Sequence, residues 1–187
     1  MNRLLLVLLG ILVAAYPLIV LFGLQVVPAY YLGLFFIVLA ALRLWFLHAS
    51  GRGQTVSLVL CLVLILVTLY VVISGQSVWF RFYPVAVNTT LLVVFLGSLW
   101  RGPSFVERMA RISDPHLPAE AIPYTRKVTI AWCCFFVGNG LVALYTALWA
   151  SFEVWGWYNG VVAYCLMGIL FAGEQLLRRR FKRNANA

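Results

Sequence analysis

The chain has 187 residues, of which 64% are hydrophobic and 10% are charged, and its mean hydropathy is +0.99. A water-soluble domain of this length cannot bury so much apolar surface, so the composition excludes a soluble globular protein and predicts an all-α, polytopic integral membrane protein. A net charge of +9 is compatible with nucleic-acid binding in a soluble protein, but here the basic residues flank apolar segments, which argues against a nucleic-acid partner.

Six apolar segments are long enough to cross the hydrocarbon core of a bilayer, which is about 30 Å thick and needs about 20 helical residues. None alternates polar and apolar residues as the strands of a membrane barrel do. The connections are mostly short, so we predict one transmembrane domain, a six-helix bundle of largely antiparallel neighbours. In chain order the predicted spans are residues 4–22, 26–47, 55–74, 84–100, 128–150 and 157–177.

The first span has an alternative interpretation as a secretory signal peptide. Arg3 would supply the charged region and the following residues a short apolar core. The apolar run continues beyond Pro17 to Phe22, however. We therefore expect a transmembrane helix that is retained.

The positions of the basic residues predict the orientation. If the N-terminus lies inside, every Lys and Arg except Arg81 falls on the inner side of the membrane. Because basic side chains resist translocation, this asymmetry predicts that both termini face the cytoplasm. The seven tryptophans fall near the predicted membrane boundaries and none at mid-membrane, as expected for interfacial residues.

A polar segment, residues 101–127, separates the fourth and fifth spans and is predicted to lie in the cytoplasm. Pro103 suits the first turn of a helix, and the spacing of Phe105, Met109 and Ile112 places them on one face. We predict a short amphipathic helix that rests on the inner leaflet. Residues 178–187 are predicted to form a basic cytoplasmic tail.

Five basic residues in this cytoplasmic loop are candidates for binding an anionic headgroup, because guanidinium groups hold phosphate through paired hydrogen bonds. The simpler interpretation is that they are topology determinants which rest on lipid headgroups. Both interpretations predict contact with membrane lipids. The residues are Arg101, Arg108, Arg111, Arg126 and Lys127.

Four polar residues lie inside the predicted spans, where polar groups are costly. Asn139, at the midpoint of its span, either bonds to a neighbouring helix or binds a ligand, and its small-residue neighbours favour packing. Asn88 and Asn159 are predicted about one turn below the outer surface, where we expect them to cap a hairpin or to bond to a neighbouring helix. The glutamate either pairs with Arg178, four residues later, or faces the bundle interior as a proton-linked group. On the outer side, Arg81 and Glu153 are the only ionisable residues, and we expect them to form an ion pair. The four intramembrane residues are Asn88, Asn139, Asn159 and Glu174.

Reactive motifs are missing from the sequence. The four cysteines lie in apolar runs, and the two histidines lie apart from each other. No Gly-x-Ser-x-Gly or HExxH pattern is present. We therefore expect no catalytic residues, no metal site and no cofactor.

Several segments of the second half resemble a family of small bacterial inner-membrane proteins that has no defined activity. They are RFYPVAVN, GPSFVERMAR, YTRKVT, WCCFFVGNG and WYNGVVAY, within about residues 80–180. Genes of that family often lie beside those for aryl-polyene or xanthomonadin-type pigment lipids. The resemblance implies the bacterial inner membrane and an accessory role in lipid or polyene synthesis or export, and it carries over no catalytic residue.

The leading hypothesis is a non-catalytic accessory protein that binds or positions a lipid-linked or acyl intermediate. Its expected partners are membrane lipids, with lipid-biosynthetic enzymes or an acyl carrier protein as further candidates. The alternatives are a small transporter or flippase for such a lipid and an integral membrane enzyme that acts on a lipid.

Overall fold

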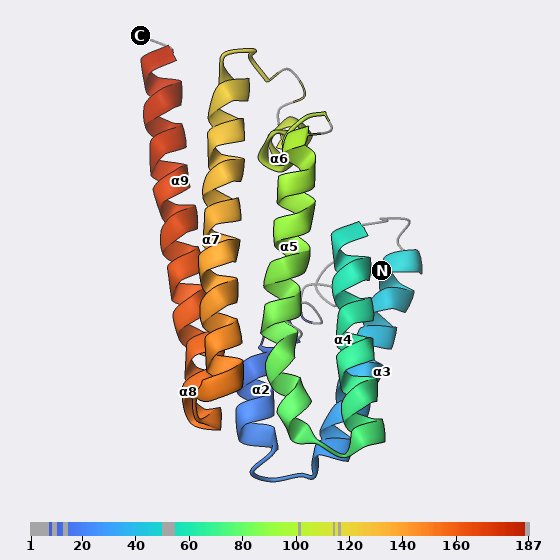
Figure 1. The fold of residues 1–187 in the computed structure, drawn as a ribbon. Coiled ribbons are helices and arrows are strands. Elements are labelled where there is room, and N and C mark those ends of the chain that lie inside the picture. Colours follow the sequence, from blue (N-terminus) through green and yellow to red (C-terminus); the bar gives the residue numbers. More distant parts are fainter. Residues whose placement is uncertain are drawn as a thin grey trace.

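The structure, a computed structural model, describes residues 8, 11, 12, 15–49, 55–100, 102–113, 115 and 117–185. Within these residues all regular structure is helical (Figure 1). The elements are α2 (Tyr16–Gly23), α3 (Ala29–Ala49), α4 (Thr55–Ser74), the 3-10 helix η1 (Ser77–Phe82), α5 (Tyr83–Trp100), α6 (Phe105–Ser113), α7 (Ala121–Trp149), α8 (Phe152–Trp157), the π-helical segment η2 (Tyr158–Val162) and α9 (Ala163–Ala185).

Five of the described helical segments are long and apolar enough to cross a membrane. They correspond to the second to sixth predicted spans, which confirms an all-helical membrane protein. Part of the first predicted span, residues 4–22, lies outside the described residues, namely 4–7, 9, 10, 13 and 14. Its described end is α2, whose eight residues would extend about 12 Å and cannot cross a bilayer alone. The five segments are Ala29–Phe46, Ser57–Ser74, Ser77–Trp100, Ala121–Trp149 and Phe152–Leu176.

Prolines set the start of two of these helices. The second predicted span begins at residue 26, whereas α3 begins at Ala29, because residues 24–26 form a turn and the residue before Pro28 is disfavoured in helical backbone. Pro84 lies in the first turn of α5, where the missing N–H costs nothing. The third predicted span, 55–74, coincides with α4.

The last seven residues of the predicted polar loop 101–127 are helical and not loop. They belong to α7, which begins at Ala121 with Pro123 in its first turn. With 29 residues, α7 is about 43 Å long and exceeds the apolar core of a bilayer by about 13 Å. The helical region of the sixth span likewise begins before residue 157, at Phe152, and continues through the predicted tail to Ala185. Hydropathy marks where a helix leaves lipid, and these helices continue beyond that point.

One end of the bundle is closed by aromatic side chains. Tyr16, Phe36, Phe80 and Trp155 are fully buried where α2, α3, η1 and α8 meet. The Tyr16 hydroxyl donates to the Phe80 carbonyl oxygen at 3.1 Å, and the Trp155 indole N–H donates to the Arg81 carbonyl oxygen at 3.0 Å. Since lipid is as apolar as these rings, close packing and such hydrogen bonds hold the helices together here. Figure 1 shows α2 enclosed beside α8 at this end.

The predicted ion pair between Arg81 and Glu153 is wrong. The Arg81 guanidinium donates instead to the backbone carbonyl oxygens of Thr146 and Ala150, the latter at 2.5 Å, at the C-terminal end of α7. The last carbonyls of a helix have no partner within the helix and carry partial negative charge, so the partly buried Arg81 cation binds them well. Glu153 is exposed to the surroundings of the bundle.

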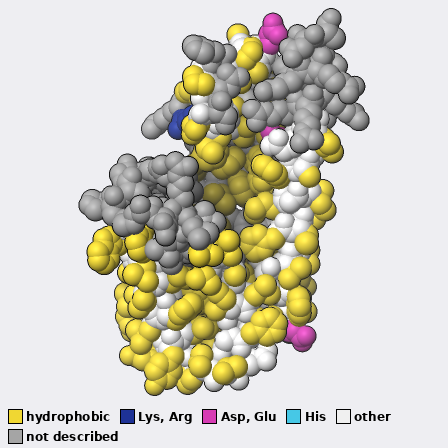
Figure 2. Space-filling model, turned by 180° about the vertical axis from the view of Figure 1, so that it is seen from behind, with side chains coloured by type: hydrophobic (Ala, Val, Ile, Leu, Met, Phe, Trp, Pro, Cys, Tyr) yellow, Lys and Arg dark blue, Asp and Glu magenta, His cyan; other side chains and the backbone are white. Residues whose placement is uncertain are grey.

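The sides of the bundle are apolar. Figure 2 shows hydrophobic side chains over most of the visible surface, few charged groups, and a hollow in the upper half lined by hydrophobic side chains. Leu66, Val93 and Ile169 are 65%, 65% and 69% exposed. A continuous apolar surface of this kind is typical of a lipid-facing protein.

Candidate functional site

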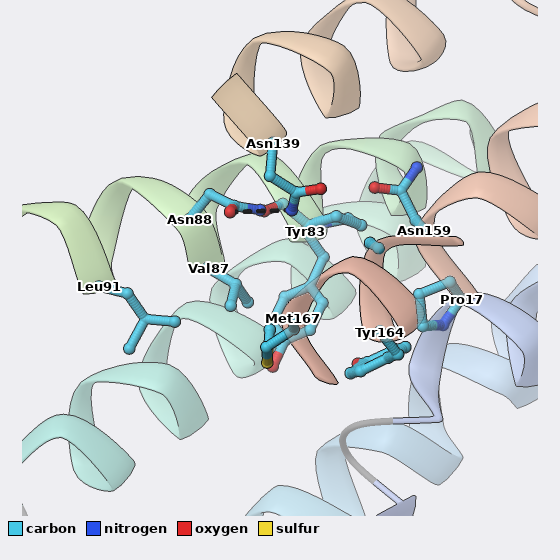
Figure 3. Close-up of a pocket in the computed structure, with 11 residues that line it drawn as sticks. Pro17, Tyr83, Val87, Asn88, Leu91, Asn139, Asn159, Tyr164 and Met167 are labelled. Carbon is cyan, nitrogen blue, oxygen red and sulfur yellow. Dashed lines mark hydrogen bonds between the residues drawn. The ribbon is translucent and has the colours of Figure 1, made fainter. Parts of the chain in front are cut away.

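Three of the four polar residues predicted inside the spans converge at one place. Asn88 comes from α5, Asn139 from α7 and Asn159 from η2, and each is more than nine-tenths buried. Figure 3 shows them together beside one pocket. The fourth, Glu174, lies on α9 about 20 Å further along the helix axis and does not take part.

Two of the asparagines, Asn88 and Asn139, belong to one chain of hydrogen bonds. The Tyr158 hydroxyl donates to Oδ1 of Asn139 at 3.0 Å, and Nδ2 of Asn139 donates to Oδ1 of Asn88 at 3.0 Å. Nδ2 of Asn88 then donates to the Pro84 carbonyl oxygen at 2.8 Å. The expected bonding of Asn139 to a neighbouring helix is therefore confirmed, a contact worth about 2 kcal/mol or less.

Asn159 is bonded differently. Its Nδ2 donates to the Trp155 carbonyl oxygen at 2.9 Å and to Oγ1 of Thr146 at 3.2 Å. Its Oδ1 is buried and has no hydrogen-bond partner among the described residues. A buried acceptor without a donor is costly, so this oxygen is the least satisfied atom of the site.

The pocket beside the cluster is small, partly open and amphiphilic, with a volume of about 60 Å³. By comparison, an engineered apolar cavity of about 150 Å³ binds one benzene molecule. The space therefore accepts a few atoms, such as the end of a chain or ordered water, and is too small for a phospholipid headgroup. Apolar side chains, among them Pro17, Val87 and Met167, line the pocket opposite the asparagines (Figure 3).

The backbone beside the pocket is irregular. Residues Tyr158–Val162 form a π-helical turn, a feature often found at functional sites. α2 packs directly against this segment, because a Cβ on Gly160 would lie 2.6 Å from the Leu18 side chain and one on Gly156 would lie 2.7 Å from the Leu21 side chain. The glycines therefore allow α2 to approach and complete the wall that carries Pro17.

The four described members of the predicted headgroup set, Arg108, Arg111, Arg126 and Lys127, do not line the pocket. Arg126 and Lys127 are exposed in the first turns of α7, 13 and 12 positions before Asn139, or about 20 Å along the helix. Arg108 is exposed on α6, with its Nε donating to the Pro103 carbonyl oxygen at 2.9 Å. Arg101 lies outside the described residues. We call Arg108, Arg126 and Lys127 the basic rim.

Arg111 is engaged by a carboxylate. Its guanidinium pairs with Glu107 at 2.7 Å, and the Glu107 side chain is 7% exposed. The two residues lie one helical turn apart, at i and i+4. Arg111 is therefore a poorer candidate for binding an external phosphate than Arg126 and Lys127.

The predicted amphipathic helix is present as α6, but its apolar face is divided. Phe105 stacks on Phe95 of α5 with ring centroids 4.1 Å apart, whereas Met109 and Ile112 are 53% and 75% exposed. The prediction that Phe105 lies on the inner leaflet with Met109 and Ile112 is wrong. Phe105 packs inside the protein because α6 docks onto α5 and α7. Met109 and Ile112 remain available to the membrane surface.

Glu174 is half-buried on α9. Its carboxylate accepts a hydrogen bond from the Gln175 amide at 3.4 Å, and its backbone carbonyl accepts one from the Tyr124 hydroxyl at 3.1 Å. The predicted ion pair between Glu174 and Arg178 stays a prediction, because the Arg178 side chain lies outside the described residues.

Sequence reasoning identified each asparagine but missed their convergence. One available signal was depth, because Asn88 and Asn159 were both predicted about one turn below the same membrane surface. Uniformly apolar helices give no indication of which side faces a neighbour, so the pairing of Asn88 with Asn139 was not predictable.

Among the described residues, no three His, Cys, Asp or Glu side chains lie close enough to hold a metal ion. Comparisons of the chain with protein-family models, with curated proteins and with solved structures find no match.

Proposed function

We propose that the protein is a non-catalytic protein of the bacterial inner membrane that binds and positions a lipid-linked or acyl intermediate. The supporting observation is the pocket of about 60 Å³ with asparagines on one side and apolar side chains on the other. Such a lining fits one end of an amphipathic molecule. The proposal includes residues 4–22 as a sixth span and both termini in the cytoplasm.

The depth of the pocket favours the far end of a lipid chain as its occupant. Asn139 lies ten residues before Trp149, the last residue of α7, which corresponds to about 15 Å along the helix. This is half the thickness of the apolar core of a bilayer, so an interfacial Trp149 would place Asn139 near the midplane. Chain ends of lipids reach the depth of Asn139, whereas Asn159, which is bonded to Thr146, lies about 10 Å nearer to the membrane surface.

In this proposal the basic rim has a separate role at the inner surface. Arg108, Arg126 and Lys127 would contact the phosphates of lipid headgroups or an acidic partner such as an acyl carrier protein. Each cation near an anionic surface contributes about 1 kcal/mol. The rim would thus hold the protein, and an enzyme that delivers the intermediate, at the leaflet from which the chain enters.

Native mass spectrometry of the detergent-extracted protein tests the proposal. We expect a co-purifying lipid in the wild type, and its loss in Met167→Trp, which fills the pocket. The matched control is Ile169→Trp on the same helix, where the side chain is 69% exposed. Retention of the lipid in Met167→Trp, or its absence from the wild type, would contradict the proposal.

A small transporter or flippase is the second candidate. Transporters bind their substrates near the midplane at interrupted helices, and here the π-helical turn Tyr158–Val162 and Pro17 of α2 both adjoin the pocket. Purified protein in vesicles that carry a fluorescent lipid distinguishes the two functions. Protein-dependent movement of the lipid between leaflets would indicate a flippase, and binding without movement would indicate a positioning protein.

A further inference from the structure

Asn159 contributes an unsatisfied acceptor to the wall of the pocket. The residue is 3% exposed, and its Oδ1 has no donor among the described residues. Figure 3 shows this oxygen pointing toward the Asn139 side of the pocket, with the amide nitrogen pointing away. The corresponding oxygens of Asn88 and Asn139 already accept hydrogen bonds. Asn159 is therefore the member of the cluster whose oxygen lacks any donor and gains most from a bond to a ligand.

The orientation of the Asn159 amide follows from its partners. Its nitrogen faces the Trp155 carbonyl oxygen, which can only accept, and Oγ1 of Thr146. The Thr146 hydroxyl donates its own hydrogen to the Ala143 carbonyl oxygen at 3.0 Å. A reversed amide would place Oδ1 against two acceptors, so the oxygen belongs on the pocket side.

The surroundings select a neutral donor. None of the described residues that line the pocket carries a charged side chain, and most are apolar. An ammonium, carboxylate or phosphate group would remain an unpaired charge among these lining side chains. The volume of about 60 Å³ limits the group to a few atoms. A hydroxyl at the end of an apolar chain meets all three requirements.

We propose that the pocket recognises the terminal hydroxyl group of an apolar chain, which donates a hydrogen bond to Oδ1 of Asn159. This inference rests on the proposed function and names the chemical class of its ligand. In the absence of such a chain, water is the donor. The terminal hydroxyl and a water molecule are the same kind of donor, because each directs an O–H group at Oδ1 of Asn159.

Matched probes test the inference on the wild-type protein in detergent. 1-Dodecanol has a hydroxyl donor, whereas dodecyl methyl ether has the same chain and oxygen without the hydrogen. We expect the alcohol to bind about 10- to 100-fold more tightly in calorimetric titrations, since the ether leaves the acceptor unpaired. Equal affinities would mean that water satisfies Asn159; they would overturn the hydroxyl inference and leave lipid binding intact. Failure of both probes to bind would also overturn it, and the mass-spectrometry experiment then decides separately on lipid binding.

Two variants assign the selectivity to one atom. Asn159→Ala removes Oδ1, and we expect the alcohol-to-ether affinity ratio to fall to about 1. Thr146→Val removes a contact of Nδ2 but leaves Oδ1 and the pocket lining unchanged, so the ratio should be preserved. An Asn159→Ala protein that keeps the ratio would contradict the inference. If this variant does not fold, the wild-type comparison alone decides.

Discussion

At the level of single residues, the asparagines of the cluster differ in how fully their polar atoms are bonded. Asn88 and Asn139 join α5 to α7 through a direct amide–amide hydrogen bond of 3.0 Å. Asn159 is anchored through its nitrogen alone, which leaves its oxygen to the pocket. We therefore assign the first two residues to helix packing and the third to ligand recognition.

The bond between Asn88 and Asn139 should be measurable as a coupling energy. In a double-mutant cycle of Asn88→Ala and Asn139→Ala, we expect the two losses of unfolding free energy to differ from additivity by about 0.6 to 1.7 kcal/mol. Reversible unfolding in mixed detergent micelles provides the measurement. Strict additivity would show that the two amides do not interact.

A second residue-level prediction concerns Arg81, which binds carbonyl oxygens at the end of α7 and lies 5.8 Å from the centre of the Phe152 ring. Arg81→Leu leaves these carbonyls unpaired and should lower the unfolding free energy by about 2 kcal/mol. Glu153→Gln should leave stability unchanged because Glu153 is exposed. Equal losses of unfolding free energy in Arg81→Leu and Glu153→Gln would indicate that Arg81 and Glu153 form an ion pair after all.

At the level of elements, the close contact between α2 and η2 shapes the pocket. α2 is short, yet it supplies Tyr16 to the aromatic core and Pro17 to the pocket wall. α2 can approach this closely because Gly156 and Gly160 have no side chains. A side chain at these positions would clash with Leu21 and Leu18, respectively. Because Asn159 and Gly160 both lie in the π-helical turn, the packing of α2 against this turn also fixes the position of Asn159.

Gly160→Ala tests this contact. The added methyl group meets Leu18 at 2.6 Å, so we expect a loss of about 1 to 3 kcal/mol in thermal or detergent-induced unfolding, relieved in part by Leu18→Ala. Gly168→Ala, on α9 with nothing within 4 Å, is the control and should be neutral or slightly stabilising. Similar effects of the two alanines would argue against close packing of α2 on η2.

At the level of the whole molecule, the arrangement of charge and apolar surface orients the protein in its membrane. The basic rim lies at one end of the bundle, and Arg81 and Glu153 lie at the other, where η1 and α8 meet α7. The topology that we propose, with both termini in the cytoplasm, places the rim at the inner leaflet and Glu153 in the periplasm.

Cysteine labelling checks this orientation. Arg108→Cys on α6 and Glu153→Cys on α8 are both exposed positions. We expect a membrane-impermeant maleimide to label the Glu153 variant in intact cells and the Arg108 variant only after permeabilisation. The reverse pattern would invert the topology, and labelling of both in intact cells would place both residues on one side and exclude α7 as a single span between them.

The sequence predicts the number and approximate position of the five described spans because length and apolar composition alone determine them. It does not predict the start of α7, since the polar residues Arg126 and Lys127 end the apolar run without ending the helix. It also misplaces Phe105, because a three-to-four-residue spacing identifies a face of α6 but not its neighbour. The convergence of the asparagines depends on how each helix is rotated about its axis, which uniformly apolar segments leave unspecified.

A crystal structure grown in a lipidic phase would test the central proposal most directly, through the electron density beside Asn159. We expect elongated density that enters the pocket from the lipid side and ends within about 3 Å of Oδ1, as a hydrogen-bonded hydroxyl requires. Isolated water peaks, or a pocket closed by Met167 and Tyr164, would contradict the binding of a lipid chain at this site.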